Sequence, residues 1–251
     1  MKRPLLAAAA TTAVLLLAPP AAADTITGTA GDDSLTGTPR SDVIRGLGGS
    51  DFIRGLGGHD LVLAGPGHDE VLGGLGADTL RGGDGRDEIR GDQGDDLLYG
   101  GAARDSMDGG VGDDMLFGGL GDDYLRGSAG ADELLGRSGA DQLTGGDGPD
   151  VLRGGAGDDG LTDWVETEFG VPAPADDDIV FGGAGNDLAG ITDGADRVRT
   201  GGGDDEIRTL DDGVKDVIRC GVGEDRVVYF GPVDPLDVLT GCEVVESVEL
   251  R

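Results

Sequence analysis

Residues 109–117 read GGVGDDMLF, and this stretch decides the fold because it is one copy of a unit that the chain repeats. From Gly28 to Thr162 the sequence divides into 15 consecutive units of nine residues, without an insertion or a deletion. Position 6 of the unit is Asp in every copy, and position 8 is aliphatic or Met in every copy. Position 1 is Gly in all copies except one, where Ala64 replaces it. A short period kept so strictly indicates a solenoid.

The residue types within one unit predict its local structure. Gly at positions 1, 2 and 4 permits positive φ angles and sharp turns, and the last three residues, with an aliphatic side chain at position 8, favour a short strand. We therefore expect six residues of turn and three of strand in each unit. If two units complete one coil, each strand pairs in parallel with the strand two units away. The predicted fold is all-β, a parallel β-roll whose core is two facing ladders of position-8 side chains.

The unit resembles the RTX, or hemolysin-type, calcium-binding nonapeptide family, whose pattern is Gly-Gly-x-Gly-x-Asp-x-U-x with an aliphatic residue at U. The resemblance covers every unit from Gly28 to Thr162 in one register. It implies a β-roll that holds Ca²⁺ between turns two units apart, with ligands from the position-6 Asp and backbone carbonyls, at about one ion per regular repeat beyond the first two. The Asp residues expected to bind calcium are Asp33, Asp51, Asp60, Asp69, Asp78, Asp87, Asp96, Asp114, Asp123, Asp132, Asp141, Asp150, Asp159, Asp187, Asp205 and Asp225.

Two units of the regular series depart from the pattern. The second unit has Pro39 and Arg40 at positions that favour small turn residues, and the ninth has Ala102 and Ala103. Position 4 of the family favours Gly, so we expect the sites of Asp42 and Asp105 to be empty or weak.

The regular roll is expected to occupy residues 24–162, and beyond Thr162 the repeat becomes irregular. Residues 163–172 break the register and are expected to form an insertion loop, while residues 163–228 as a whole continue the roll in degenerate form. Residues 229–251 are expected to form an irregular cap, because the end of a solenoid exposes strand edges and an open core. The two cysteines, Cys220 and Cys242, are expected to form a disulfide that staples this cap; two buried thiols are the alternative.

Residues 1–23 have the features of a secretory signal peptide. Lys2 and Arg3 precede an apolar run from Leu5 to Ala18, and an Ala-rich end predicts cleavage near Ala23. A membrane anchor is the alternative, but the run is too short to span a bilayer comfortably, and no span is expected in the mature chain. The sequence thus predicts a secreted, extracellular protein, in a compartment where calcium modules work at roughly millimolar concentrations.

The composition restricts the partners and the core. The chain has 52 Gly, 50 acidic and 19 basic residues, a net charge of −31, and only 4% aromatic residues. So acidic a chain excludes nucleic acid as a direct partner. Its core must be thin and aliphatic, and without metal the like charges repel, so calcium binding and folding are expected to be one event.

The sequence lacks the motifs of common catalytic sites. It has no His-Glu-x-x-His and no Gly-x-Ser-x-Gly, and its only histidines, His59 and His68, occupy position 5 of consecutive units and are expected to be solvated turn residues. We expect a non-enzymatic, calcium-binding structural, adhesive or partner-binding module. The alternative is a hydrolase or toxin accessory protein with activity in region 163–251.

One face of the predicted roll is unusually apolar. Positions 7 and 9 point outward, and the even-numbered units share one sheet, where nine of 14 outward positions in the regular series are apolar. Such a patch favours an interface with the C-terminal segment, a second copy or a cell-envelope component, although outward strand positions also tolerate β-forming residues. The apolar residues are Val43, Leu61, Leu63, Leu97, Tyr99, Met115, Phe117, Leu135 and Val151.

Overall fold

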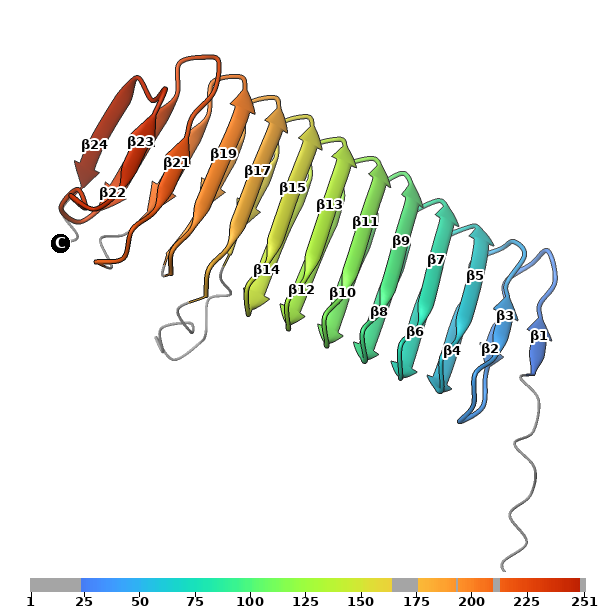
Figure 1. Cartoon of the computed structure of the whole chain (residues 1–251). Helices are drawn as coiled ribbons and strands as arrows, with labels where there is room; N and C mark the ends of the chain where they lie inside the picture. The colour runs from blue at the N-terminus through green and yellow to red at the C-terminus, as the bar shows by residue number, and fades with distance from the viewer. Residues whose placement is uncertain (1–23, 164–175, 193, 210–212, 249–251) are drawn as a thin grey trace, which may run out of the picture.

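The computed structural model describes residues 24–163, 176–192, 194–209 and 213–248. These residues form 24 β-strands and no helix, and the strands lie side by side along a long rod from β1 at one end to β24 at the other (Figure 1). All the strand pairings are parallel, and they build two sheets of twelve strands each. The expected all-β parallel β-roll is confirmed. The signal peptide and most of the insertion loop fall outside the described residues.

Sheet 1 contains the odd-numbered strands, which come from the even-numbered sequence units in the regular series. Its strands are β1 (Thr25–Thr27), β3 (Val43–Arg45), β5 (Leu61–Pro66), β7 (Thr79–Asp84), β9 (Leu97–Ala102), β11 (Met115–Leu120), β13 (Glu133–Ser138), β15 (Val151–Ala156), β17 (Ile179–Ala184), β19 (Arg197–Gly202), β21 (Val217–Arg219) and β23 (Val238–Thr240).

Sheet 2 contains the even-numbered strands. They are β2 (Ser34–Thr36), β4 (Phe52–Gly57), β6 (Glu70–Leu75), β8 (Glu88–Gln93), β10 (Ser106–Val111), β12 (Tyr124–Ala129), β14 (Gln142–Asp147), β16 (Gly160–Thr162), β18 (Leu188–Gly190), β20 (Glu206–Thr209), β22 (Arg226–Phe230) and β24 (Val244–Val248).

Neighbouring strands pair with the expected offset of two units. In sheet 1, Leu116 pairs with Leu98 on one side and Leu134 on the other. From β4 to β15 each strand is six residues long, which is longer than the three expected. The reason is that positions 2 and 3 also pair with the adjacent coil, as Gly119 of β11 pairs with Gly101 of β9, so the strand runs on through position 1. The turn is therefore confined to positions 4–6.

The core is a double ladder of aliphatic side chains, one from each strand. Every position-8 residue from Ile44 to Leu161 is at most 1% exposed. Position 6 and position 1 also face inward, and the position-6 Asp side chains are buried beside this ladder. Since a single aliphatic row from each sheet fills the interior, the apolar core is thin.

The C-terminal region keeps both sheets despite its irregular sequence. Leu152 pairs with Val180 across the insertion, and Val198 pairs with Ile218 across the extra residues of a later unit. The offset between these paired strands exceeds two units, yet the core positions stay in register. The register of the core is thus kept across both insertions.

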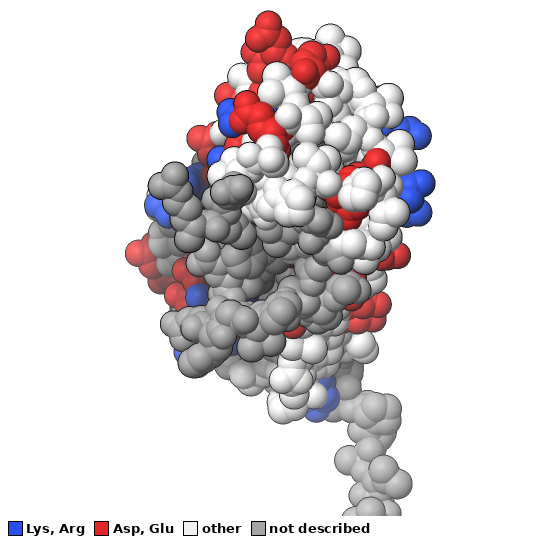
Figure 2. Space-filling model, turned by 90° about the vertical axis from the view of Figure 1, so that its left-hand side faces the viewer, with Lys and Arg blue, Asp and Glu red and all other residues white. Residues whose placement is uncertain are grey.

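The described part of the segment after residue 228 continues both sheets. Strands β23 and β24 extend sheets 1 and 2, and the expected disulfide joins Cys220 to Cys242. Val245 occupies a core position in register with Val227 but is 44% exposed. Figure 2 shows this end of the molecule as an uncharged area with acidic side chains around it. Within the described ranges, no helix is long and apolar enough to cross a membrane.

Candidate metal centres in the turns

The position-6 aspartates form a hydrogen-bonded ladder along each edge of the roll. The backbone N–H of Asp96 donates to Oδ1 of Asp114 at 2.7 Å, and the N–H of Asp114 donates to Oδ1 of Asp132 at 2.7 Å. The same bond recurs from coil to coil, starting with the N–H of Asp24 and Oδ1 of Asp42 at 3.0 Å. One oxygen of each carboxylate is therefore fixed by the coil before it.

The second carboxylate oxygen, Oδ2, is buried and has no hydrogen-bond partner in fifteen of these aspartates. A buried ionised oxygen without a protein partner is costly, so a repeated set of them indicates a row of cation sites. The fifteen residues are Asp51, Asp60, Asp69, Asp78, Asp87, Asp96, Asp105, Asp114, Asp123, Asp132, Asp141, Asp150, Asp159, Asp187 and Asp205.

Main-chain carbonyls face the same space as the free oxygen. A Cβ atom built on Gly55, at position 1, would collide with both Oδ2 of Asp60 and the carbonyl oxygen of Gly73. At position 2, a Cβ on Gly74 would collide with the carbonyl oxygen of Leu56. At position 1 of such a turn, a carboxylate oxygen and a carbonyl oxygen of the next coil thus lie together at a place where a side chain does not fit.

This set of donors fits Ca²⁺, which takes six to eight oxygen ligands and accepts carboxylates and carbonyls together. Among the described residues, no group of three or more His, Cys, Asp or Glu side chains comes together. The metal would therefore depend mainly on backbone carbonyls of stacked turns, which explains why Gly and a single Asp recur in the unit.

The comparison with protein families agrees with this geometry. The model of the RTX calcium-binding nonapeptide repeat matches residues 21–39, 36–71, 72–107, 99–134, 108–143, 135–162, 175–189 and 191–212. The chain belongs to the RTX family. No curated protein matches the chain.

Three position-6 aspartates of this RTX chain differ from the fifteen, because their Oδ2 atom accepts a hydrogen bond from the protein. Oδ2 of Asp33 and of Asp42 accepts from a Thr at position 2, and Oδ2 of Asp225 accepts the backbone N–H of Gly221 at 2.9 Å. Asp105, in contrast, has the same free oxygen as its neighbours, although Ala102 and Ala103 precede it. Sequence reasoning placed Asp33 and Asp225 among the metal ligands and left Asp105 out. In the first two units the donor is the Thr at position 2.

Burial changes the acidity of the RTX aspartates. Desolvation, reinforced by neighbouring carboxylates, raises the pKa of Asp105 to about 8 and that of Asp114 to about 7. Asp42 behaves in the opposite way. Burial alone would raise its pKa, but the hydrogen bonds from Thr38 and Asp24 and the charge of Arg40 lower the pKa below its ordinary value.

These shifts lead to a pH prediction for the calcium-free protein. A folded-state pKa above the unfolded value means that the folded protein binds protons more tightly than the unfolded chain does. Protonation of these aspartates therefore stabilises the fold most below about pH 4, and this stabilisation is lost as the pH rises through about 6 to 8. Metal-stripped protein is expected to gain strand content and thermal stability when the pH is lowered from 8 to 5. Circular dichroism in chelator-treated buffers measures this.

The calcium-saturated protein is the control for the pH prediction. There, protons compete with Ca²⁺ for the carboxylates, so acidification is expected to weaken binding and lower the melting temperature. A metal-free protein that loses strand content between pH 8 and pH 5 would contradict the prediction.

The two histidines have structural roles in the turns. The Nδ1 atom of His59 accepts the backbone N–H of Ala77 at 2.9 Å, and that of His68 accepts the N–H of Arg86 at 2.9 Å. In other turns an Asp at position 5 accepts in the same way, as Asp113 accepts from the N–H of Ala131. The histidines are exposed, as expected, and they also serve as links in a second ladder between coils.

Proposed function

We propose that this RTX protein is a secreted, non-enzymatic module that folds on binding many Ca²⁺ ions. The observation that carries the proposal is the set of fifteen buried Oδ2 atoms without partners, several of which lie beside a carbonyl oxygen of the next coil, as Oδ2 of Asp60 lies beside that of Gly73. The position-6 aspartates would hold the ions together with these carbonyls. Bound Ca²⁺ supplies positive charge inside the roll, and fifteen such ions would bring 30 positive charges to a chain of net charge −31.

Two features support an extracellular location. Cys220 and Cys242 form a disulfide, which persists in oxidising compartments. Calcium sites of extracellular modules bind at roughly millimolar concentrations, where a multi-site module of this kind would be filled. Residues 1–23 would direct export and be removed near Ala23. N-terminal sequencing of the exported protein tests that step.

The number of bound ions tests the calcium proposal. We expect the exported protein to bind about fifteen Ca²⁺ ions, measured by equilibrium dialysis and by native mass spectrometry. Mg²⁺ at the same concentration is the control, because its small size and octahedral preference suit a site of spaced carbonyls poorly. Binding of only one or two calcium ions, or equal binding of Mg²⁺, would contradict the proposal.

The outer face of sheet 1 supports a second role, the binding of a partner. Its position-9 side chains form one continuous row in register, and this row contains no acidic residue. The row consists of Arg45, Leu63, Arg81, Tyr99, Phe117, Leu135, Arg153, Phe181, Arg199 and Arg219. On the parallel position-7 row from β3 to β21, Glu133 is the one acid, and it forms an ion pair with Arg153 at 2.7 Å.

Aromatic rings and guanidinium groups are layered on this face. The rings of Tyr99 and Phe117 stack with centroids 4.9 Å apart, Arg81 lies 4.8 Å from the Tyr99 ring, and Arg137 lies 5.0 Å from the Phe117 ring. On a protein with a strong negative net charge, such a cationic and aromatic strip complements an anionic polymer with flat apolar faces. We propose an acidic polysaccharide of a cell envelope as its partner.

Binding of polygalacturonate, a polymer of uronic acids, tests this second role. The double variant Arg81→Gln and Arg137→Gln is expected to lower the affinity at least tenfold, in calcium, by isothermal titration calorimetry. The matched control, Arg54→Gln with Arg90→Gln, changes two arginines of sheet 2. Arg54 lies over the ring of Phe52, so the control also removes a contact between a guanidinium group and a ring. Equal affinities for both variants, or no binding by the unaltered protein, would contradict the proposal.

A further inference from the structure

The turns of the roll occur in two states, which differ at position 2. In the open state, the position-2 residue has a positive φ angle and Oδ2 of the position-6 Asp has no partner. All fifteen turns with a free Oδ2 are of this kind, whether position 2 is Gly, as in Gly110 (φ 111°), or another residue, as in Leu47 (φ 84°) and Ser128 (φ 87°).

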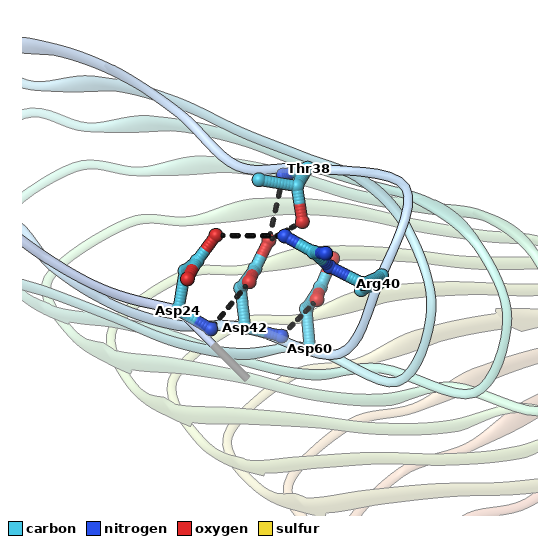
Figure 3. A network of polar contacts seen from close by, with 5 residues as sticks. All are labelled: Asp24, Thr38, Arg40, Asp42 and Asp60. Carbon is cyan, nitrogen blue, oxygen red and sulfur yellow. Dashed lines mark hydrogen bonds and ion pairs between the residues drawn. The ribbon is translucent and has the colours of Figure 1, made fainter. Parts of the chain in front are cut away.

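In the closed state, position 2 has no positive φ angle and its backbone N–H donates to Oδ2. The N–H and the hydroxyl of Thr38 donate to Oδ2 of Asp42 at 2.6 and 2.9 Å, and those of Thr29 donate to Oδ2 of Asp33 at 2.5 and 3.0 Å. Figure 3 shows Thr38 directed at the Asp42 carboxylate. The same oxygen that is free in the open turns therefore has two donors here.

Thr at position 2 favours the closed state, and Gly is compatible with it too, because Gly221 has no positive φ angle and its N–H donates to Oδ2 of Asp225 at 2.9 Å. A β-branched residue such as Thr is strongly disfavoured at positive φ, whereas Gly, and to a lesser extent Asn, adopts it readily. Thr also contributes a hydroxyl that bonds the carboxylate locally. For Asp42 to bind a cation through Oδ2, both bonds from Thr38 would have to break. In an open turn no such bond competes.

We infer that a Thr at position 2 keeps its turn free of calcium, so that Thr29 and Thr38 keep the first coil metal-free. Its carboxylates are instead held by protein donors, and an ion pair of 3.1 Å between Arg40 and Asp24 adds to this network (Figure 3). The first coil thereby offers a preformed strand edge on which the calcium-dependent coils can stack. The inference rests on the proposed calcium function, and it adds a specificity rule to it.

Exchange of position-2 residues in both directions tests the rule by counting bound ions. Leu47→Thr with Leu56→Thr converts two open turns to the closed pattern and is expected to remove about two Ca²⁺ ions, measured by native mass spectrometry and equilibrium dialysis. Both leucines are exposed, at 50% and 44%, so the core is not altered. The matched control, Leu47→Asn with Leu56→Asn, keeps a residue that tolerates positive φ and should retain all the ions.

The reverse change opens the first coil. Thr29→Gly with Thr38→Gly is expected to add one or two ions. Circular dichroism in calcium establishes that each variant is folded. The rule is overturned if the double Leu→Thr variant and the double Leu→Asn variant bind equal numbers of ions. The inference that the first coil is metal-free is overturned if the double Thr→Gly variant gains no ion. Failure of the unaltered protein to bind calcium would instead refute the proposed function, so the two failures are distinguishable.

Discussion

Removal of calcium is expected to unfold the roll. In excess chelator, the protein should lose most of its strand signal in far-ultraviolet circular dichroism and expand markedly in small-angle X-ray scattering. The reason is that the fold orders a glycine-rich chain around a core one aliphatic side chain deep in each sheet, which is little apolar area against a large loss of chain entropy. The closely stacked carboxylates also repel one another when no cation separates them.

Restoration of calcium provides the control for this experiment. Refilling to millimolar Ca²⁺ should recover the strand signal, whereas an equal ionic strength of NaCl should not, because screening weakens repulsion without supplying ligand bonds. A chelated protein that stays compact and strand-rich at pH 8 would contradict the calcium-dependent fold. It would also require another source of cohesion for the buried carboxylates.

Truncation of one core side chain in the middle of the rod should have the second largest effect. Leu116 is fully buried between Leu98 and Leu134, and Leu116→Ala removes its contacts with both neighbouring coils. We expect a loss of about 2–5 kcal/mol in the free energy of unfolding, by analogy with other buried leucines. Guanidinium denaturation in saturating calcium measures it.

The residue next to Leu116 is a matched control. Met115 is 38% exposed on the outer face of sheet 1, so Met115→Ala leaves the core intact and should cost less than about 1 kcal/mol. Similar losses for the two variants would mean that the core ladder does not hold the coils together as the structure indicates.

The nine-residue period was sufficient to predict the roll. Asp at position 6 and an aliphatic residue at position 8 recur in every regular unit, and this fixed both the inward face and the pairing two units apart, as with Leu116 and Leu98. The disulfide between Cys220 and Cys242 was also predictable, because two cysteines in an exported chain favour a bond.

The two turn states could not be predicted from the period alone. They depend on the φ angle at position 2 and on which atom reaches Oδ2, and the unit pattern gives neither directly. In the sequence, Thr29 and Thr38 are only variations at position 2, and Pro39 and Arg40 are the larger departures from the unit pattern. The length of the strands could not be predicted for a similar reason, since Gly at position 2 favours a turn but in this roll pairs between coils, as Gly119 does with Gly101.

The alternation of successive units between the two sheets limits how such a rod can change in length. Loss or duplication of a single unit would move every later strand to the opposite sheet and divide the strip from Arg45 to Arg219 between two faces. Changes by pairs of units, one whole coil at a time, would preserve it. Recombination within the gene is therefore expected to leave functional descendants mainly when whole coils are exchanged, and the rod can be lengthened in the laboratory by the same step.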